Sequence, residues 1–246
     1  MNNNRVLVTR ASEQVGDLVE RLTAIGCEVI EFPLIEIVEP IDHGSALRKA
    51  MVAADATSEE STSYAWIVLT SPNAADRSLR HLHKAAGAQI AAIGPGTANV
   101  CLSLGFSVSL IPDRSIGEGL VEAFPDCDVP GARVLLPRAE TARDVVPEGL
   151  AAKGWIVDTV TAYRTQPRKP TATECERAAT ATMALATSSS TARLLVAVLG
   201  GRVPPIVVSI GPQTTATFEE LGVHVDATAE PHTIDGLVQQ VARLMV

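Results

Sequence analysis

The sequence lacks the features that mark a membrane protein or a nucleic-acid-binding protein. No apolar run approaches the roughly 20 residues that a membrane-spanning helix needs. Acidic residues outnumber basic ones, 28 to 20, and a net charge of −8 argues against a basic surface for nucleic acid. Residues 1–10 contain no secretory signal pattern. We therefore expect a cytoplasmic protein with no membrane and no nucleic-acid partner.

Metal-binding and common catalytic motifs are also missing. The four cysteines, Cys27, Cys101, Cys127 and Cys175, are widely spaced, with no C-x-x-C pair and no Cys/His cluster. Structural thiols are therefore favoured over a metal or redox site. The sequence has no G-x-S-x-G, H-E-x-x-H, G-x-x-x-x-G-K-[ST] or G-x-G-x-x-G motif. We predict no metal site, and no ordinary catalytic constellation is evident.

The sequence does contain a regular alternation of strand-like and helix-like segments. A β-branched run at 5–9 is followed by Ser12, a favourable N-cap, and by a helical pattern that Gly26 ends. Further strands are predicted at 28–32, 64–70, 91–93, 107–111, 133–138 and 156–162. Helices are predicted over about 42–54, from 73 to about 86, and from the first Gly-Pro turn to about 104. This alternation predicts an α/β protein with two five-stranded parallel sheets, each covered on both faces.

The chain is an internal duplication. Arg-Val-Leu-Val-Thr-Arg at 5–10 returns as Arg-Val-Leu-Leu-Pro-Arg at 133–138, an offset of 128 (133 − 5). Ile-Gly-Pro at 93–95 returns at 210–212, and Leu-Thr-Ser at 69–71 matches Ala-Thr-Ser at 186–188, both at an offset of 117 (211 − 94, 187 − 70). The two halves are therefore expected to share one architecture.

Two long connections suggest where the domains divide. The simplest division is near residue 128, after the first repeat, but the extended segments lie at 33–41 and 165–173. If both are crossovers, residues 1–35 and 170–246 form one discontinuous domain and residues 41–163 the other. Residues 36–40 and 164–169 are then a two-stranded linker, and the halves have exchanged their leading βαβ units.

Hydroxyl, glycine and arginine residues gather at the predicted carboxyl ends of the strands, where parallel α/β sheets bind ligands. Each Gly-Pro turn also opens a helix, whose N-terminal amides attract anions. Helix capping alone would select many of these serines and threonines. Taken together, the set favours an anionic ligand, and its members are Thr9, Arg10, Thr70, Ser71, Gly94, Thr97, Arg138, Tyr163, Arg164, Thr187, Ser188, Ser189, Gly211 and Thr214.

The ordered set of motifs resembles the uroporphyrinogen-III synthase family. The resemblance rests on the paired arginine-flanked strands, Leu-Thr-Ser-Pro-Asn at 69–73, the two Ile-Gly-Pro turns and Thr-Ala-Tyr-Arg-Thr at 161–165. It implies two flavodoxin-like domains joined by a two-stranded linker, and no cofactor. The implied substrate is hydroxymethylbilane, a linear tetrapyrrole with eight carboxylates, which a transient contact with hydroxymethylbilane synthase could hand over to a monomeric enzyme.

The same resemblance implies the reaction and one catalytic residue. The substrate loses water, and ring D closes inverted through a spiro intermediate to give uroporphyrinogen III instead of the spontaneous type I isomer. Tyr163, one of two tyrosines, matches the family's proposed proton donor; packing on a hinge is the alternative. Because the chain and the substrate are both acidic, attraction must be local, from Arg10, Arg138, Arg143, Arg164 and helix N-termini. A non-catalytic two-lobed protein that binds an anionic metabolite is the alternative function.

Overall fold

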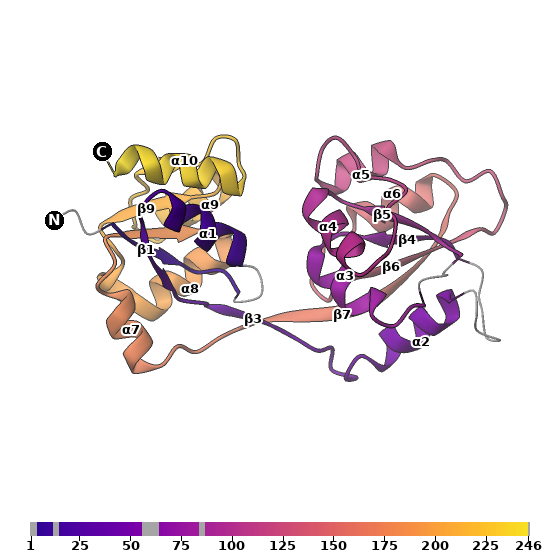
Figure 1. Cartoon of the computed structure of the whole chain (residues 1–246), viewed down its shortest axis with the longest axis horizontal. Coiled ribbons are helices and arrows are strands. Elements are labelled where there is room, and N and C mark those ends of the chain that lie inside the picture. Colours follow the sequence, from indigo (N-terminus) through magenta and orange to yellow (C-terminus); the bar gives the residue numbers. More distant parts are fainter. Residues whose placement is uncertain (1–3, 12–14, 56–63, 84–86, 246) are drawn as a thin grey trace. The chain divides into compact units, whose positions relative to one another are not determined.

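The computed structural model describes residues 4–11, 15–55, 64–83 and 87–245. The chain divides into two compact units, one made of Met1–Ile37 with Gln166–Val246 and the other of Val38–Thr165. Each unit contains its own sheet with helices packed on it (Figure 1). The prediction of an α/β protein with two parallel sheets is confirmed.

The first unit has a five-stranded sheet in the order β10-β9-β8-β1-β2, with every neighbouring pair parallel. Its strands are β1 (Arg5–Val8), β2 (Glu28–Glu31), β8 (Met183–Ala186), β9 (Ile206–Ser209) and β10 (Ala227–Thr228). Its helices are α1 (Gly16–Ala24), α7 (Ala172–Ala178), α8 (Ser189–Leu199), α9 (Pro212–Glu220) and α10 (Ile234–Leu244), and a 3-10 turn, η2 (Gly200–Arg202), follows α8.

Alternating side chains bury both faces of this sheet. Leu7 belongs to a core that includes Phe218 of α9, whereas its neighbours Val6 and Val8 belong to a second core with Leu237 of α10. Successive side chains of a strand point to opposite faces, so Val6, Leu7 and Val8 of the interior strand β1 must all be apolar. The carboxyl ends of the strands are consequently the place where polar side chains can gather.

The second unit has a sheet in the order β3-β7-β6-β4-β5, in which β7, β6, β4 and β5 are parallel neighbours. The strands of this sheet are β3 (Ile35–Val38), β4 (Tyr64–Leu69), β5 (Gln89–Ala92), β6 (Arg133–Ala139) and β7 (Ile156–Pro167). The boundaries between the units fall within β3, after Ile37, and within β7, after Thr165. The helices of the second unit are α2 (Ser45–Ala54), α3 (Pro72–Leu79), α4 (Pro95–Ser103), α5 (Gly117–Ala123) and α6 (Val145–Ala152). The core contains Phe124, whose ring lies 4.9 Å from that of Trp66 and 5.7 Å from that of Trp155.

The strand order identifies the edge at which each unit can bind a ligand. Taken in chain order, the strands of the first unit are arranged 2-1-3-4-5, the order of flavodoxin-like sheets. Their order reverses between β1 and β8, and between the corresponding strands β6 and β4 in the second unit. A crevice outside the carboxyl ends of the strands is expected at such a reversal.

Several element boundaries differ from those predicted. The segment 107–111 is not a strand: a single bridge joins Ala91 to Leu110, and Pro112, which cannot donate to a ladder, follows directly. Residues 36–38 of the segment 36–40, predicted as one half of a two-stranded linker, belong to β3, which begins one residue earlier at Ile35. The helix predicted to reach residue 86 ends at Leu79, and residues 84–86 lie outside the described part of the chain.

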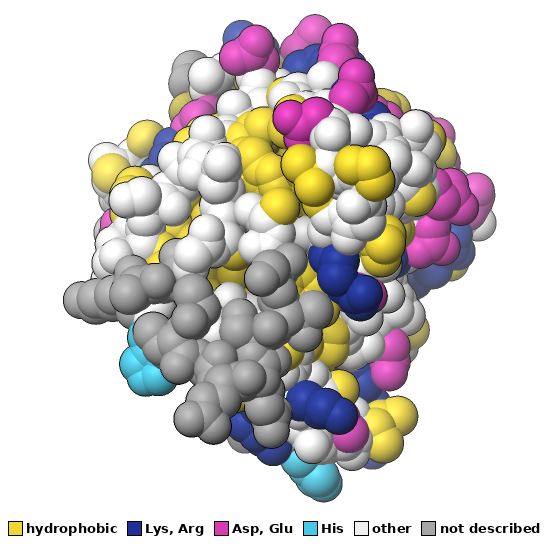
Figure 2. All heavy atoms as spheres, turned by 90° about the vertical axis from the view of Figure 1, so that its right-hand side faces the viewer, with side chains coloured by type: hydrophobic (Ala, Val, Ile, Leu, Met, Phe, Trp, Pro, Cys, Tyr) yellow, Lys and Arg dark blue, Asp and Glu magenta, His cyan; other side chains and the backbone are white. Residues whose placement is uncertain are grey.

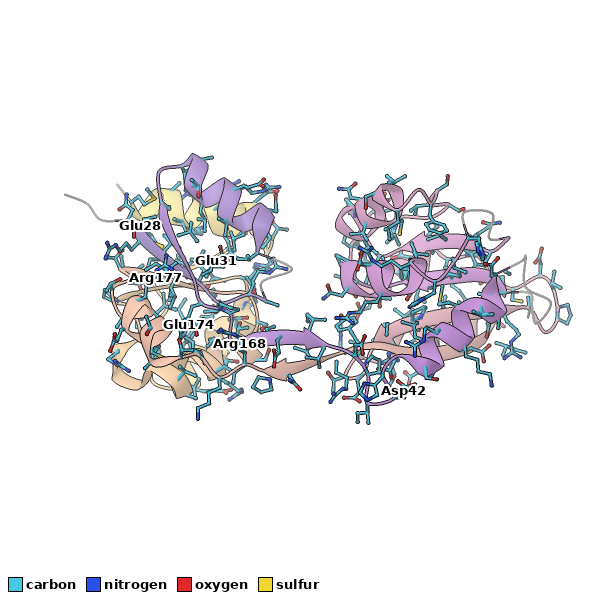
Figure 3. All side chains as sticks on the ribbon, turned by 60° about the horizontal axis from the view of Figure 1, so that its bottom comes forward. Glu28, Glu31, Asp42, Arg168, Glu174 and Arg177 are labelled. Atoms are coloured by element: carbon cyan, nitrogen blue, oxygen red, sulfur yellow. The ribbon has the colours of Figure 1, made fainter. Side chains whose placement is uncertain are left out.

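Other boundaries change because neighbouring groups extend or cap an element. Strand β7 continues past residue 162 to Pro167, and α7 begins within the segment 165–173 that was predicted to be a connection. Arg168 lies beside Glu174 of α7 and donates to its carboxylate at 2.6 Å (Figure 3). Ser12, the predicted cap of the first helix, lies outside the described residues; α1 begins at Gly16.

None of the helices in the described part of the chain is long and apolar enough to cross a bilayer.

Candidate functional site

A cavity of about 180 Å³ lies at the carboxyl ends of the second unit's strands. Thr70 follows β4, and Arg138 lies at the end of β6, so both strands beside the order reversal contribute to it. The rest of its lining is mostly apolar: Ile93, Gly117, Leu136, Ala142, Arg143, Val145, Val146 and Pro147. The structure thus brings Thr70 and Arg138 together, and adds Arg143.

The predicted catalytic tyrosine contacts a predicted binding serine. The phenolic oxygen of Tyr163 lies 3.1 Å from the hydroxyl oxygen of Ser71, and Tyr163 is 8% exposed. Ser71 is the N-cap of α3, where its Oγ accepts the backbone N–H of Ala74 at 3.1 Å. Tyr163 is therefore held at the N-terminus of a helix that begins at the carboxyl edge of the sheet.

A register shift in the sheet sets the direction of Tyr163. Arg138 of β6 pairs with Thr161, but the next residue, Ala139, pairs with Tyr163, so β7 carries one extra residue at this point. Bulges of this kind redirect a side chain and are frequent beside active sites.

Arg138 lines the cavity and also holds the loop beside it, and its predicted role in binding stays a prediction. Its guanidinium pairs with the carboxylate of Asp144 at 2.9 Å and donates to the carbonyls of Ala142 and Arg143. Only 12% of its side chain is exposed. Arg143 is the more accessible cation, with 74% of its side chain exposed and Glu118 at 3.3 Å.

A larger cavity, about 610 Å³, occupies the matching position in the first unit. The residues after β8 and β9, at the starts of α8 and α9, form it: Thr187, Ser188, Ser189, Ser190, Ile210, Gly211, Pro212, Gln213, Thr214 and His232. Ser188 caps α8 by accepting the N–H of Thr191 at 3.2 Å. Ser189 donates to the carbonyl of Gln213 at 3.1 Å, which ties the two helix starts together. The lining supplies hydroxyl groups beside two helix N-termini and no carboxylate.

Three of the predicted threonines are buried and have structural positions. Thr9 is fully buried and donates to the carbonyl of Leu185 at 2.9 Å, joining β1 to β8. Thr97 and Thr214, in the first turns of α4 and α9, are 2% and 3% exposed. Thr214 nevertheless belongs to the lining of the larger cavity, and the expectation that Thr97 and Thr214 hold substrate carboxylates stays a prediction.

The remaining predicted arginines lie apart from these cavities' linings. Arg10 follows β1 and is half-buried; burial lowers the pKa of its guanidinium, and the charge of Asp17 opposes that shift. Arg164 of β7 donates from Nε to the carbonyl of Glu39 at 3.1 Å. The other tyrosine, Tyr64, is half-buried at the amino end of β4, with the Arg133 guanidinium 5.8 Å from its ring centre.

Another segment packs against each of the two Gly-Pro turns, but only at Gly94 is it close enough to leave no room for a Cβ. A Cβ on Gly94 would meet Ser115 Oγ at 2.4 Å, and one on Gly211 would meet the His232 ring at 3.5 Å. The two contacts are equivalent in the duplication, since both pairs are 117 residues apart (211 − 94, 232 − 115). His232 is missing from the predicted set of site residues. The sequence signal that could have found it is the offset of 117 residues, which leads from Ser115 to His232.

No metal centre is apparent where the structure is described: residues 4–11, 15–55, 64–83 and 87–245 hold no group of three or more potential ligands. Cys27 and Cys101 are buried, and burial raises the pKa of the Cys101 thiol to about 11. A thiol with such a pKa is a poor nucleophile and a poor metal ligand.

Fold and cavities together define an α/β protein of two parallel-sheet units, each with a ligand-sized hollow at the carboxyl ends of its strands. A family model described as uroporphyrinogen-III synthase HemD matches residues 16–239. The chain belongs to the uroporphyrinogen-III synthase family. It is accordingly an enzyme, a cyclising hydro-lyase of porphyrin biosynthesis.

Individual relatives agree with this membership. The chain is 33% identical to the uroporphyrinogen-III synthase of Synechococcus elongatus, over 95% of this chain and 92% of the relative. It is 25% identical to that of Chlorobaculum parvum, over 92% of each. Among solved structures, the Helicobacter pylori enzyme superposes with a TM-score of 0.63 at 15% identity, covering 98% of this chain and 99% of that one. A mutant Thermus thermophilus enzyme gives 0.60 at 14% identity, over 98% of both chains; these two structures support the fold.

Proposed function

We propose that the chain converts hydroxymethylbilane to uroporphyrinogen III with Tyr163 as the proton donor. The single observation that carries this assignment is the position of the Tyr163 phenol. It lies 3.1 Å from Ser71 at the N-terminus of α3, beside the reversal in strand order. Ser71 is held as the N-cap of α3, and Tyr163 is almost wholly buried, so the phenol is fixed before a substrate arrives.

The proton transfer accounts for the loss of water. As the C–O bond of the hydroxymethyl group breaks, its electron pair leaves on oxygen and the Tyr163 proton completes a water molecule. The pyrrole nitrogen then releases its proton, which gives the azafulvene and allows the phenol to be restored. A positioned donor of this kind typically contributes about 10²–10⁴-fold to the rate.

Isomer choice is a matter of orientation more than of acid–base chemistry. Because the linear substrate closes spontaneously to the type I product, the enzyme must hold ring D so that its substituted carbon attacks. Fixing reacting groups in one geometry is among the largest contributions an enzyme can make. A site made of hydroxyls, glycines and helix N-termini, as in the first unit's cavity, suits that task.

We propose that substrate carboxylates are bound locally by the accessible members of the predicted set. In the first unit these are Ser188 and Ser189 with the backbone N–H groups of Ser188 and Gln213, and in the second unit Thr70 with Arg143. Local binding is needed because the chain carries a net charge of −8. On the face shown in Figure 2, basic side chains are scattered singly and acidic ones gather along the upper and right margins.

Several finer points belong to the same proposal. We propose that the segments at 36–40 and 164–169 act as a two-stranded linker between domains at 1–35 with 170–246 and 41–163. The duplicated halves have, on this proposal, exchanged their leading βαβ units. A monomeric state, a cytoplasmic location, the absence of a cofactor and a transient hand-over from hydroxymethylbilane synthase stay predictions.

Isomer analysis of freshly made hydroxymethylbilane tests the function. With wild-type protein we expect uroporphyrinogen III, and with Tyr163→Phe we expect a folded protein whose kcat is lower by about 10²-fold or more. Tyr64→Phe is the matched control, because Tyr64 lies at the opposite, amino end of its strand, and it should keep wild-type turnover. Type I product alone, with tight substrate binding, would favour a non-catalytic binding protein.

A further inference from the structure

The hydroxyl of Ser71 touches two groups at once. Its Oγ accepts the backbone N–H of Ala74 at 3.1 Å and lies 3.1 Å from the phenolic oxygen of Tyr163. All three residues belong to the second unit, on β7 and at the start of α3. The serine therefore connects a helix N-terminus to the tyrosine that the proposed function uses.

Hydrogen-bond accounting gives this contact a direction. A serine hydroxyl has one proton to donate and two lone pairs, and the N–H of Ala74 occupies one lone pair. If Tyr163 donated to the remaining lone pair, its proton would be engaged when the substrate needs it. If Ser71 donates to Tyr163, the phenolic proton is free, and a donor already faces the oxygen that becomes negative.

The helix behind Ser71 strengthens that donor. The N-terminus of α3 carries a partial positive charge, and a hydrogen bond from Ala74 polarises the Ser71 O–H further. Pro72 occupies the first turn of α3, where its ring fixes the backbone and costs no hydrogen bond. Ser71 is consequently held in place whether or not a substrate is present.

The duplication separates this arrangement from ordinary helix capping. Ser188, the counterpart of Ser71 (71 + 117), also caps its helix, but its hydroxyl bonds to those of Ser190 at 2.9 Å and Thr191 at 3.1 Å. The residue 128 positions before Tyr163 is Ile35 (163 − 128). Both copies thus have the cap, and the second unit adds a tyrosine to it.

We propose that Ser71 is a positioning residue that donates its hydroxyl proton to Tyr163, so that the phenol is aimed at the substrate and its negative charge is stabilised after proton transfer. The proposal rests on the proposed role of Tyr163. It replaces the earlier expectation that Ser71 binds a substrate carboxylate directly.

The test compares Ser71→Gly with Ser71→Thr. Glycine is nearly as good an N-cap as serine, so Ser71→Gly removes the hydroxyl with little effect on α3, whereas threonine keeps both the cap and the donor. We expect Ser71→Gly to lower kcat by about tenfold or more with KM within about twofold, and Ser71→Thr to restore most of the activity. In a Tyr163→Phe background, Ser71→Gly should cause no further loss of kcat.

Two controls keep the outcomes distinct. Thr171→Ala removes the cap of α7, away from both cavities, and should leave kcat unchanged; circular dichroism checks that each variant is folded. A wild-type kcat in Ser71→Gly, a raised KM alone, or a full additional loss in the Tyr163→Phe background overturns the positioning role while Tyr163 keeps its own. A wild-type kcat in Tyr163→Phe instead overturns the catalytic proposal, and the positioning role with it.

Discussion

Two arginines of the second unit's cavity differ in burial and therefore in the groups that they contact. Arg138 is 12% exposed and its guanidinium bonds Asp144 and two backbone carbonyls, whereas Arg143 is 74% exposed. A planar guanidinium can satisfy several acceptors at once, which no other side chain reproduces. Arg138 therefore shapes the loop from which Arg143 reaches the cavity.

The same substitution should lower stability at Arg138 and raise KM at Arg143. Arg138→Gln leaves Asp144 and the loop carbonyls without their donor, so we expect it to lower the free energy of unfolding by about 1.5–3 kcal/mol. Arg143→Gln should change stability by no more than about 0.5 kcal/mol and raise KM for the carboxylate-rich substrate. Urea unfolding and steady-state kinetics of the two variants measure these effects. If Arg138→Gln were as stable as wild type and had a raised KM, the result would support direct binding of the substrate by Arg138.

The sequence predicted at which edge of each sheet the candidate residues lie, but not how deeply each side chain is buried. Thr187 and Ser188 line a cavity as predicted, because a residue after a strand and before a helix must lie at the carboxyl edge. Thr97 and Thr214 lie at the same edge but are buried. Whether a hydroxyl faces outward depends on the helix rotation and on neighbours such as His232, which local sequence does not determine.

At the scale of elements, the start of α7 is fixed by a reciprocal cap. Thr171 Oγ1 accepts the N–H of Glu174 at 3.3 Å, and the Glu174 carboxylate accepts the N–H of Thr171 at 2.7 Å. Arg168 adds an ion pair to the same carboxylate at 2.6 Å. The hydrogen bond from the Thr171 backbone, then Arg168 and the Thr171 hydroxyl, lower the pKa of Glu174 to about 2.

This cap should make part of the stability dependent on pH. An unperturbed glutamate has a pKa of 4.5, so the folded state binds a proton less readily than the unfolded chain. The stabilisation is therefore complete above that value and is lost as the pH falls toward about 2. We expect Glu174→Gln to be less stable than wild type near neutral pH and the difference to shrink in acid. Urea unfolding across this pH range measures the effect, with Glu176→Gln, an exposed residue of the same helix, as the control. A stability difference between Glu174→Gln and wild type that did not change with pH would contradict the idea.

Element prediction succeeded where one strong local signal was present and failed where tertiary contacts decide. The Gly-Pro turns gave the starts of α4 and α9 at Pro95 and Pro212, since proline at a first helical position is a local signal. The segment 107–111 has a strand-like pattern but only one bridging contact, through Leu110. Conversely, β3 is a short segment between Pro33 and Pro40 that was predicted only as an extended connection, and it becomes a strand because β7 lies beside it.

On the scale of the whole molecule, the chain builds two separate cores from one duplicated sequence. Phe218 is fully buried in a core of the first unit, and Phe124 in that of the second. Both tryptophans of the chain, Trp66 and Trp155, pack against Phe124. Tryptophan fluorescence therefore reports on the second unit alone, whereas far-ultraviolet circular dichroism reports on helices and strands of both.

That difference allows the two-unit organisation to be tested with single substitutions. Phe218→Ala should remove about 3–5 kcal/mol from the first unit, because a fully buried ring leaves a cavity that its neighbours fill only in part. If the units fold independently, circular dichroism will show an early transition while the fluorescence midpoint stays at the wild-type value. Phe124→Ala should do the reverse and lower the fluorescence midpoint. Equal shifts of both probes in both variants would mean that the units unfold together, because then the loss of either core destabilises the entire chain.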